Sequence, residues 1–261
     1  MKQRMWLAAV LGMLIPSWAL GQVKEVRVTM EGLACPFCVF NVEKQIKRVP
    51  GIEPASVRTD LDKGVTTAAW KPDVPFDPAL LKKAVKDSGF TLKSIEITAE
   101  GKVRRVDRSA PRLELVVPAG KVPITLGRAE RADRRRSWER LAEAAEAEGA
   151  TARVWGEVIE AGDSGWSLVL HGWGPVEHGA QVDFAVNDLA CEQCSLRLVQ
   201  RLESAPGILH AEADHERDLV QVWVESDRPD VDALRRQIEE AGFTVLHAHV
   251  AGEPPEPGSA R

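Results

Sequence analysis

Hydrophobic and polar residues alternate over 23–31, where Val26, Val28 and Met30 fall on one face. Such alternation predicts a half-buried strand. Over 39–49 the apolar residues instead recur at helical spacing, and the Pro-Gly pair that follows ends the helix. The same rules predict strands over 56–61 and 65–70 around a hairpin turn at 62–64, a helix over 77–89 and a strand over 91–98.

The same order of elements returns in the second half of the chain. Sequence landmarks recur in the same order, which indicates an internal duplication. The landmarks are Leu-Ala-Cys-x-x-Cys at 33–38 and 189–194, Pro-Gly-Ile at 50–52 and 206–208, and Gly-Phe-Thr at 89–91 and 242–244. The second copy predicts strands over 181–187, 209–214, 218–225 and 243–249, and helices over 192–204 and 229–240.

Each copy therefore predicts the order βαββαβ, which is typical of a ferredoxin-like sandwich with two helices on a four-stranded antiparallel sheet. We place the first copy at 23–99, the second copy at 181–251 and a middle module at 100–180. The predicted fold class is α+β. It comprises two ferredoxin-like sandwiches that flank a small α+β or OB-like middle module.

The middle module matches neither copy. Its pattern predicts a charged connector over 100–111 and a helix over 132–150. Within that helix, Arg134-Arg135-Arg136 is expected to form a solvated face, balanced by glutamates of the same helix such as Glu139 and Glu146. The strands of this module are predicted over 112–117, 121–126, 153–160 and 166–173.

The two ends of the chain are predicted to lie outside the folded units. Lys2 and Arg4 precede an apolar run at 5–15 and then small residues, which predicts a cleaved signal peptide over 1–21. The apolar run is too short to cross a hydrocarbon core of about 30 Å. We therefore expect a soluble protein exported to a bacterial periplasm. The Pro- and Glu-rich tail at 252–261 is predicted to be disordered.

Composition and motifs argue against two classes of function, nucleic-acid binding and enzymatic catalysis. The formal net charge of -5 argues against a global electrostatic grip on nucleic acid, and we expect no nucleic-acid partner. The sequence shows no Ser/His/Asp constellation, phosphate-cradling glycine loop or zinc-hydrolase motif, so we expect no enzyme. The six histidines all lie beyond residue 170 and are expected to be scattered surface residues.

The four cysteines form two Cys-x-x-Cys pairs, Cys35 with Cys38 and Cys191 with Cys194, each where a loop meets a predicted helix. This spacing brings both sulfurs within reach of one ion, and the helix start favours thiolate. A closed structural zinc site needs four ligands, whereas each pair supplies two. The sequence therefore favours soft ions that accept low coordination, Cu(I) or Hg(II), over Zn(II).

Each copy resembles the heavy-metal-associated (HMA) domain of copper chaperones, of metal-pumping ATPases and of the periplasmic mercuric-ion-binding protein. The resemblance rests on the cysteine motif, with Leu33 and Leu189 in place of the usual methionine. It implies metal ligation by the four cysteines, with Phe90 and Phe243 shielding the sites. It also implies a metal donor or acceptor protein as partner, such as a membrane metal transporter.

Two other functions fit the same cysteines. A dithiol–disulfide oxidoreductase would use the pairs for thiol exchange, and inert disulfides are common in exported proteins. A non-catalytic interaction scaffold would carry degenerate metal domains. If the pairs bind metal, Glu192 adds a negative charge beside the second pair. On that basis we expect the first pair to bind a soft cation more tightly.

Overall fold

A computed structural model describes residues 22–72, 74–106, 112–116, 123–128, 130–147, 150–161, 165–176 and 179–251. The predicted signal peptide at 1–21 and the predicted tail at 252–261 lie outside the described residues. No helix of the described part is long and apolar enough to cross a membrane.

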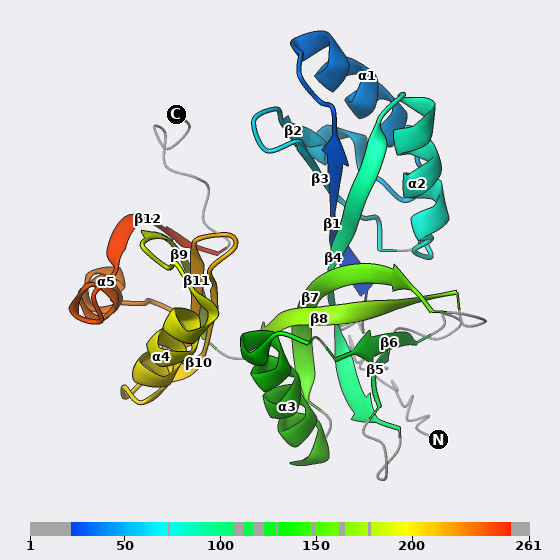
Figure 1. Ribbon diagram of the computed structural model, residues 1–261. Coiled ribbons are helices and arrows are strands. Elements are labelled where there is room, and N and C mark those ends of the chain that lie inside the picture. The colour runs from blue at the N-terminus through cyan, green and yellow to red at the C-terminus, as the bar shows by residue number, and fades with distance from the viewer. Residues whose placement is uncertain are drawn as a thin grey trace, which may run out of the picture.

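The first copy forms the predicted elements in the predicted order (Figure 1). Its strands pair antiparallel in the order β2-β3-β1-β4, and residues such as Val26, Leu81 and Ile97 meet in its core. The elements are β1 (Gln22–Glu31), α1 (Pro36–Ile46), the 3-10 turn η1 (Pro54–Ser56), β2 (Arg58–Asp60), β3 (Val65–Ala69), α2 (Pro78–Asp87) and β4 (Thr91–Arg105).

The second copy repeats this arrangement with a sheet of order β10-β11-β9-β12, also antiparallel throughout. Its core is separate from that of the first copy and is built around Phe184, Leu198 and Val222. The elements are β9 (Ala180–Asn187), α4 (Glu192–Glu203), β10 (Ile208–Asp214), β11 (Leu219–Val224), α5 (Val231–Glu240) and β12 (Thr244–Val250).

The middle module is a small barrel that shares a strand with the first copy. Strands β4, β5, β6, β8 and β7 pair in that order, and β7 pairs back to β4 to close the ring. The β6–β8 pair is parallel, and α3 lies between β6 and β7 in the chain, as in OB-type barrels. The new elements are β5 (Leu113–Val116), β6 (Ile124–Gly127), α3 (Ala132–Ala147), β7 (Thr151–Glu160) and β8 (Trp166–Pro175).

Strand β4 corrects the predicted connector. Residues 100–105 continue the strand instead of leaving it, while 107–111 lie outside the described residues. The sequence pattern explains the longer strand. The inward-facing positions occupied by Ile97 and Ala99 continue to Val103, which is also buried. The charged residues between these positions point outward, so they do not end the strand. One continuous strand thus belongs to both the first copy and the barrel.

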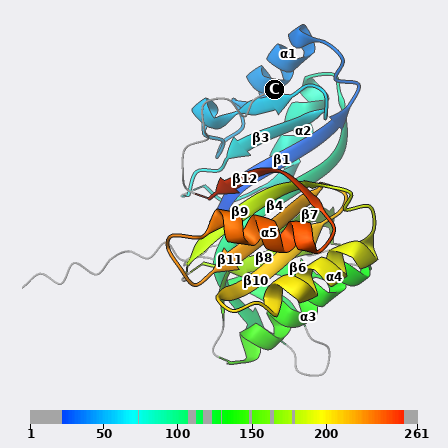
Figure 2. The ribbon, with the colours of Figure 1, turned by 90° about the vertical axis from the view of Figure 1, so that its left-hand side faces the viewer.

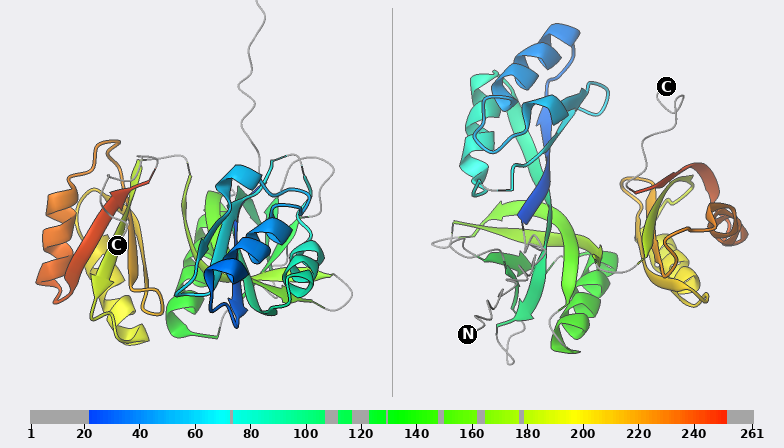
Figure 3. Two further views of the ribbon diagram at one scale, coloured as in Figure 1. Left: turned by 90° about the horizontal axis from the view of Figure 1, so that it is seen from above. Right: turned by 180° about the vertical axis from the view of Figure 1, so that it is seen from behind.

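The second copy packs on the barrel with the sheet face that its own helices leave uncovered (Figure 2 and Figure 3). Trp223 of β11 is 2% exposed and stacks on Trp155 of β7, with ring centroids 5.8 Å apart. His210 of β10 is 1% exposed and lies between Trp223 and Trp173 of the barrel. A Cβ added at Gly174 of β8 would overlap the Trp223 indole, so the close contact between this indole and the β8 backbone requires glycine.

Arginines of α3 extend this interface. Arg134 pairs with Glu216 at 2.8 Å, and both Arg136 and Arg140 pair with Glu203 of α4. The prediction that the 134–136 run faces solvent and is balanced by its own helix is therefore wrong for Arg134 and Arg136. Helical periodicity places charges on a helix, but it does not show that a second folded unit covers them.

The left-handed backbone at Gly51 offers a test of the first copy's packing. Gly51 has φ +95°, and a Cβ there would overlap the Trp70 indole, whereas Gly89 has φ +86° with nothing nearby. We expect Gly89→Ala to lower the free energy of unfolding by about 1 kcal/mol through backbone strain alone. Gly51→Ala should cost about 1–3 kcal/mol more because of the overlap. Urea unfolding measures both, and equal losses would contradict the packing described.

Candidate metal centres

The first cysteine pair sits at the start of α1. Cys35 is the N-cap of this helix, with extended backbone angles, and its Sγ accepts the backbone N–H of Cys38 at 3.2 Å. Pro36 occupies the first turn, where its lack of an N–H costs nothing. The first N–H groups of a helix have no partner within the helix, so a side-chain acceptor is favoured there. In this chain the acceptor is the sulfur of the candidate ligand.

The second pair repeats this geometry at the start of α4. Cys191 is the N-cap, and its Sγ accepts the N–H of Cys194 at 3.1 Å. The preceding loop turns through Asp188, which has φ +69°, where the first copy uses Gly32 with φ +84°. An aspartate tolerates this left-handed conformation better than most residues do. The loss of the first copy's glycine therefore leaves the loop geometry intact.

Each pair is closed as a disulfide in the structure, with Cα atoms 5.1 Å apart. The predicted partners within each pair are thus adjacent. Among the described residues, no group of three or more His, Cys, Asp or Glu side chains could hold a metal ion. Each candidate centre consequently offers two sulfurs, and an ion held there would keep further coordination positions open for another molecule.

The surroundings of the two pairs differ in exposure. Leu189 is fully buried beneath the second loop, whereas Leu33 is half-buried against the first core. Phe90 and Phe243 are both half-buried against the cores of their copies, and Phe90 lies against Gly32 of the first loop. The roles of the two phenylalanines as shields stay predictions.

Aromatic side chains also flank the first pair on its outer side. Phe37 and Phe40 are 86% and 69% exposed, and both belong to α1. In the second copy, Gln193 takes the place of Phe37 and is also exposed. The first pair therefore lies beside exposed apolar side chains, whereas the second pair has a polar residue at the equivalent position.

Glu192 does not stand free beside the second pair. Its carboxylate accepts the backbone N–H of Ala132, the first residue of α3. This bond ties the carboxylate to α3 without removing its charge, so the expectation that the first pair binds more tightly stays a prediction. The sequence analysis also missed Arg197, whose guanidinium lies 4.0 Å from the Sγ of Cys194. Arg197 follows Cys194 by three residues, and side chains at this spacing are neighbours on a helix, so the sequence could have indicated it.

Within the part of the chain that the structure describes, the histidines do not gather at either pair. His247 and His249 are exposed on β12, as expected for surface residues. His210 contradicts that expectation, because it is buried between two indoles and lies 3.0 Å from a carboxylate oxygen of Glu212. The second copy therefore uses a histidine in its interface with the barrel. His178 lies outside the described residues.

A cleft of about 630 Å³ separates the first copy's sheet from the second copy's sheet, with barrel strand β7 between them. Burial raises the pKa of Glu25 despite the opposing charges of Arg27 and Arg217. Burial, together with repulsion from Arg27, lowers the pKa of Arg217 to about 10. Burial alone would raise the pKa of Glu100, but Arg153 and a neighbouring lysine bring it below its usual range. These charged residues lie where the second copy faces the first copy and the barrel, apart from the cysteine motifs.

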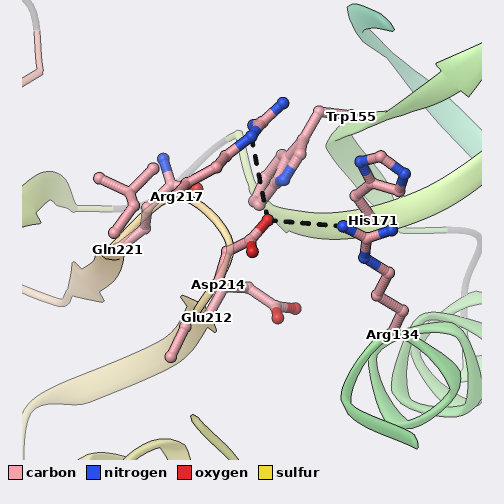
Figure 4. Close-up of a pocket in the computed structure, with 9 residues that line it drawn as sticks. Arg134, Trp155, His171, Glu212, Asp214, Arg217 and Gln221 are labelled. Carbon is pink, nitrogen blue, oxygen red and sulfur yellow. Dashed lines mark ion pairs between the residues drawn. The ribbon is translucent and has the colours of Figure 1, made fainter. Parts of the chain in front are cut away.

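A smaller cavity of about 20 Å³ lies at the same interface (Figure 4). Asp214 of the second copy lies 3.8 Å from Arg134 of α3 and 3.9 Å from Arg217. Trp155 and His171 line the cavity from the barrel. The volume is about that of a single water probe, so this cavity has no room for a larger ligand.

Known proteins similar to the chain include copper transporters. Copper-transporting ATPase 1 of Rhizobium meliloti (strain 1021) is 32% identical over 102 residues, which cover 37% of this chain and 12% of that protein. The probable copper-transporting ATPase HMA5 of Arabidopsis thaliana is 26% identical over 234 residues, covering 82% of this chain and 21% of that protein. The chain thus spans about a fifth or less of the length of these relatives.

The chain also has matches among solved structures, at lower identity. The CopZ metallochaperone is 23% identical, covers 25% of this chain and 98% of its own, and has a TM-score of 0.24. The N-terminal soluble domains of Bacillus subtilis CopA are 14% identical, cover 90% of this chain and 97% of their own, and have a TM-score of 0.24. These scores are too low to support an argument about the fold, which rests on the strand order. No model of a known protein family matches the chain. The chain is similar, over part of its length, to copper-transporting ATPases.

Proposed function

We propose that the protein binds a soft metal ion at each of its two cysteine pairs and passes it on by ligand exchange. Cu(I) is the first candidate cargo and Hg(II) the second. The observation that carries the proposal is the repeated geometry, in which Cys35 and Cys191 each cap a helix while the second cysteine lies one turn into it. The partial identity to copper-transporting ATPases supports copper in particular.

The helix start explains how a pair of sulfurs would hold a cation yet release it. Thiolates are the metal-binding form of cysteine, and the positive end of a helix stabilises their negative charge. The N–H groups of Cys38 and Cys194 already point at the partner sulfurs, at 3.2 and 3.1 Å. With two protein ligands, the ion can accept a thiolate of a partner before it leaves the first pair. Transfer is then stepwise exchange without covalent chemistry on a substrate, and we propose no enzymatic activity.

The setting of this transfer is also part of the proposal. The predicted signal peptide over 1–21 would deliver the chain to the periplasm. The partner would be a metal donor or acceptor protein, such as a membrane metal transporter. The exposed Phe37 and Phe40 beside the first pair are the kind of apolar surface that protein contacts use. We propose no nucleic-acid partner.

A second candidate function is dithiol–disulfide exchange. The observation in its favour is that both pairs are closed as disulfides. In that case each closed pair would gain two electrons and two protons from a partner dithiol, which becomes a disulfide, and a reduced pair would pass them to a partner disulfide. Metal transfer is favoured because both pairs sit in βαββαβ units. The strand order is β2-β3-β1-β4 in the first copy and β10-β11-β9-β12 in the second. Thioredoxin-like enzymes have a different strand order.

The stoichiometry of metal binding follows from two separate pairs. We expect the reduced protein to retain two equivalents of Cu(I) under anaerobic conditions. The Cys35→Ser/Cys38→Ser variant and the Cys191→Ser/Cys194→Ser variant should each retain one, because neither pair contributes ligands to the other. Gel filtration followed by metal analysis measures this. A variant that loses both equivalents would show that one shared site replaces the two proposed centres.

Ligand number predicts which metals are retained. Two thiolates suit Cu(I), whereas Zn(II) lacks two of the four ligands it prefers. In competition with a chelator of moderate affinity, we expect the reduced protein to keep Cu(I) and to lose Zn(II). Replacement of all four cysteines by serine is the control for weak surface binding. Retention of Zn(II) together with loss of Cu(I) would reject the proposed cargo.

A further inference from the structure

The interface between the second copy and the barrel reaches the second cysteine pair. It begins at Gly174, where the Trp223 indole packs on the bare backbone of β8. It continues along α3, where Arg140 pairs with Glu203 of α4. It ends at Glu192, which directly follows Cys191 and accepts the N–H of Ala132. Helices α3 and α4 lie side by side along this line (Figure 2).

This last contact is a helix cap supplied by another folded unit. Ala132 is the first residue of α3, so its N–H has no partner within the helix. Glu192 is the first residue of α4 and belongs to the Cys-x-x-Cys segment itself. One side chain therefore links the start of α3 to the loop that carries the second pair. In the first copy Pro36 occupies the equivalent position and cannot form such a bond.

We use docking for the packing of the second copy on the barrel and α3. The effect of docking on a bound ion depends on the charges near that ion. A Cu(I) ion held by two thiolates carries one net negative charge, and negative charge is stabilised near a helix N-terminus. Docking places the N-terminus of α3 against Glu192, the residue that directly follows Cys191. Docking also keeps the Glu192 carboxylate on a backbone N–H. In an undocked second copy the carboxylate would lose this N–H donor, and its charge would repel the thiolates beside it more strongly.

We propose that docking of the second copy on α3 raises the Cu(I) affinity of Cys191 and Cys194, with Glu192 as the positioning residue that couples the two. This inference rests on the proposed function. Coupling between two equilibria is reciprocal, so Cu(I) binding at the second pair also strengthens docking. The first pair has no such link and binds independently of docking.

The test disturbs docking at a point remote from the cysteines. Gly174→Ala places a methyl group against Trp223, whereas Gly127→Ala, on barrel strand β6, meets neighbours no closer than 3.6 Å. Each change is made in the Cys35→Ser/Cys38→Ser background, which isolates the second pair. Each is also made in the Cys191→Ser/Cys194→Ser background, which isolates the first. Cu(I) affinity is then measured on the reduced protein against a colorimetric Cu(I) chelator.

We expect Gly174→Ala to weaken Cu(I) binding at the second pair about fivefold or more, the lower end of typical coupling. The first pair should stay unchanged, which also shows that the first copy remains folded, and Gly127→Ala should change neither pair. Equal affinities of the second pair with and without Gly174→Ala would overturn the inference, as would equal weakening of both pairs. Failure of both pairs to retain Cu(I) in the unmodified protein would reject the proposed function as well.

A reciprocal measurement tests the role of Glu192. We expect Cu(I) loading to slow amide hydrogen exchange in the first turn of α3. Glu192→Ala should abolish that slowing, while Pro36→Ala, the same position in the first copy, should preserve it. A purely structural role of Glu192 would change exchange equally in the metal-free and loaded protein, and that result would overturn the proposed coupling.

Discussion

The organisation of this protein depends on a hydrogen bond made twice, from the N–H of the second cysteine of each pair to the Sγ of the first. A helix start leaves N–H groups without partners, and here a sulfur accepts one of them. That constraint places both sulfurs at one helix end, where the negative charge of the reduced thiolates would be stabilised. The strands before α1 and α4, and the cores beneath them, hold the two helix starts in place. The proposed chemistry follows from this local geometry.

The two copies are built alike but are connected differently to the rest of the chain. The first copy shares strand β4 with the barrel, so these two units are joined by a continuous backbone. The second copy is joined through side chains, chiefly Trp223 against Gly174 and the carboxylates opposite α3. A shared strand is a permanent connection, whereas a side-chain interface can open. This difference gives the two cysteine pairs different neighbours in one molecule.

Most of the architecture could be predicted from local pattern. Alternation and helical spacing located the elements of both copies because each element buries one face, and the repeated Cys-x-x-Cys marks the candidate sites. The pattern failed where one unit meets another. The charge pattern predicts a connector from Glu100, yet Val103 continues the inward face of β4. Local pattern predicts that Arg134 faces solvent and that Glu192 adds a charge at a helix start, yet each binds across the interface. Partners distant in sequence leave no trace in local periodicity.

The central claim is that each pair holds a soft ion with two sulfurs and no further protein ligand. X-ray absorption spectroscopy of the protein loaded with two equivalents of Cu(I) tests this most directly. The account predicts a copper environment of two sulfur neighbours in a nearly linear arrangement, the same in both single-pair variants. Nitrogen or oxygen neighbours supplied by the protein, or a signal from copper atoms close to one another, would contradict it.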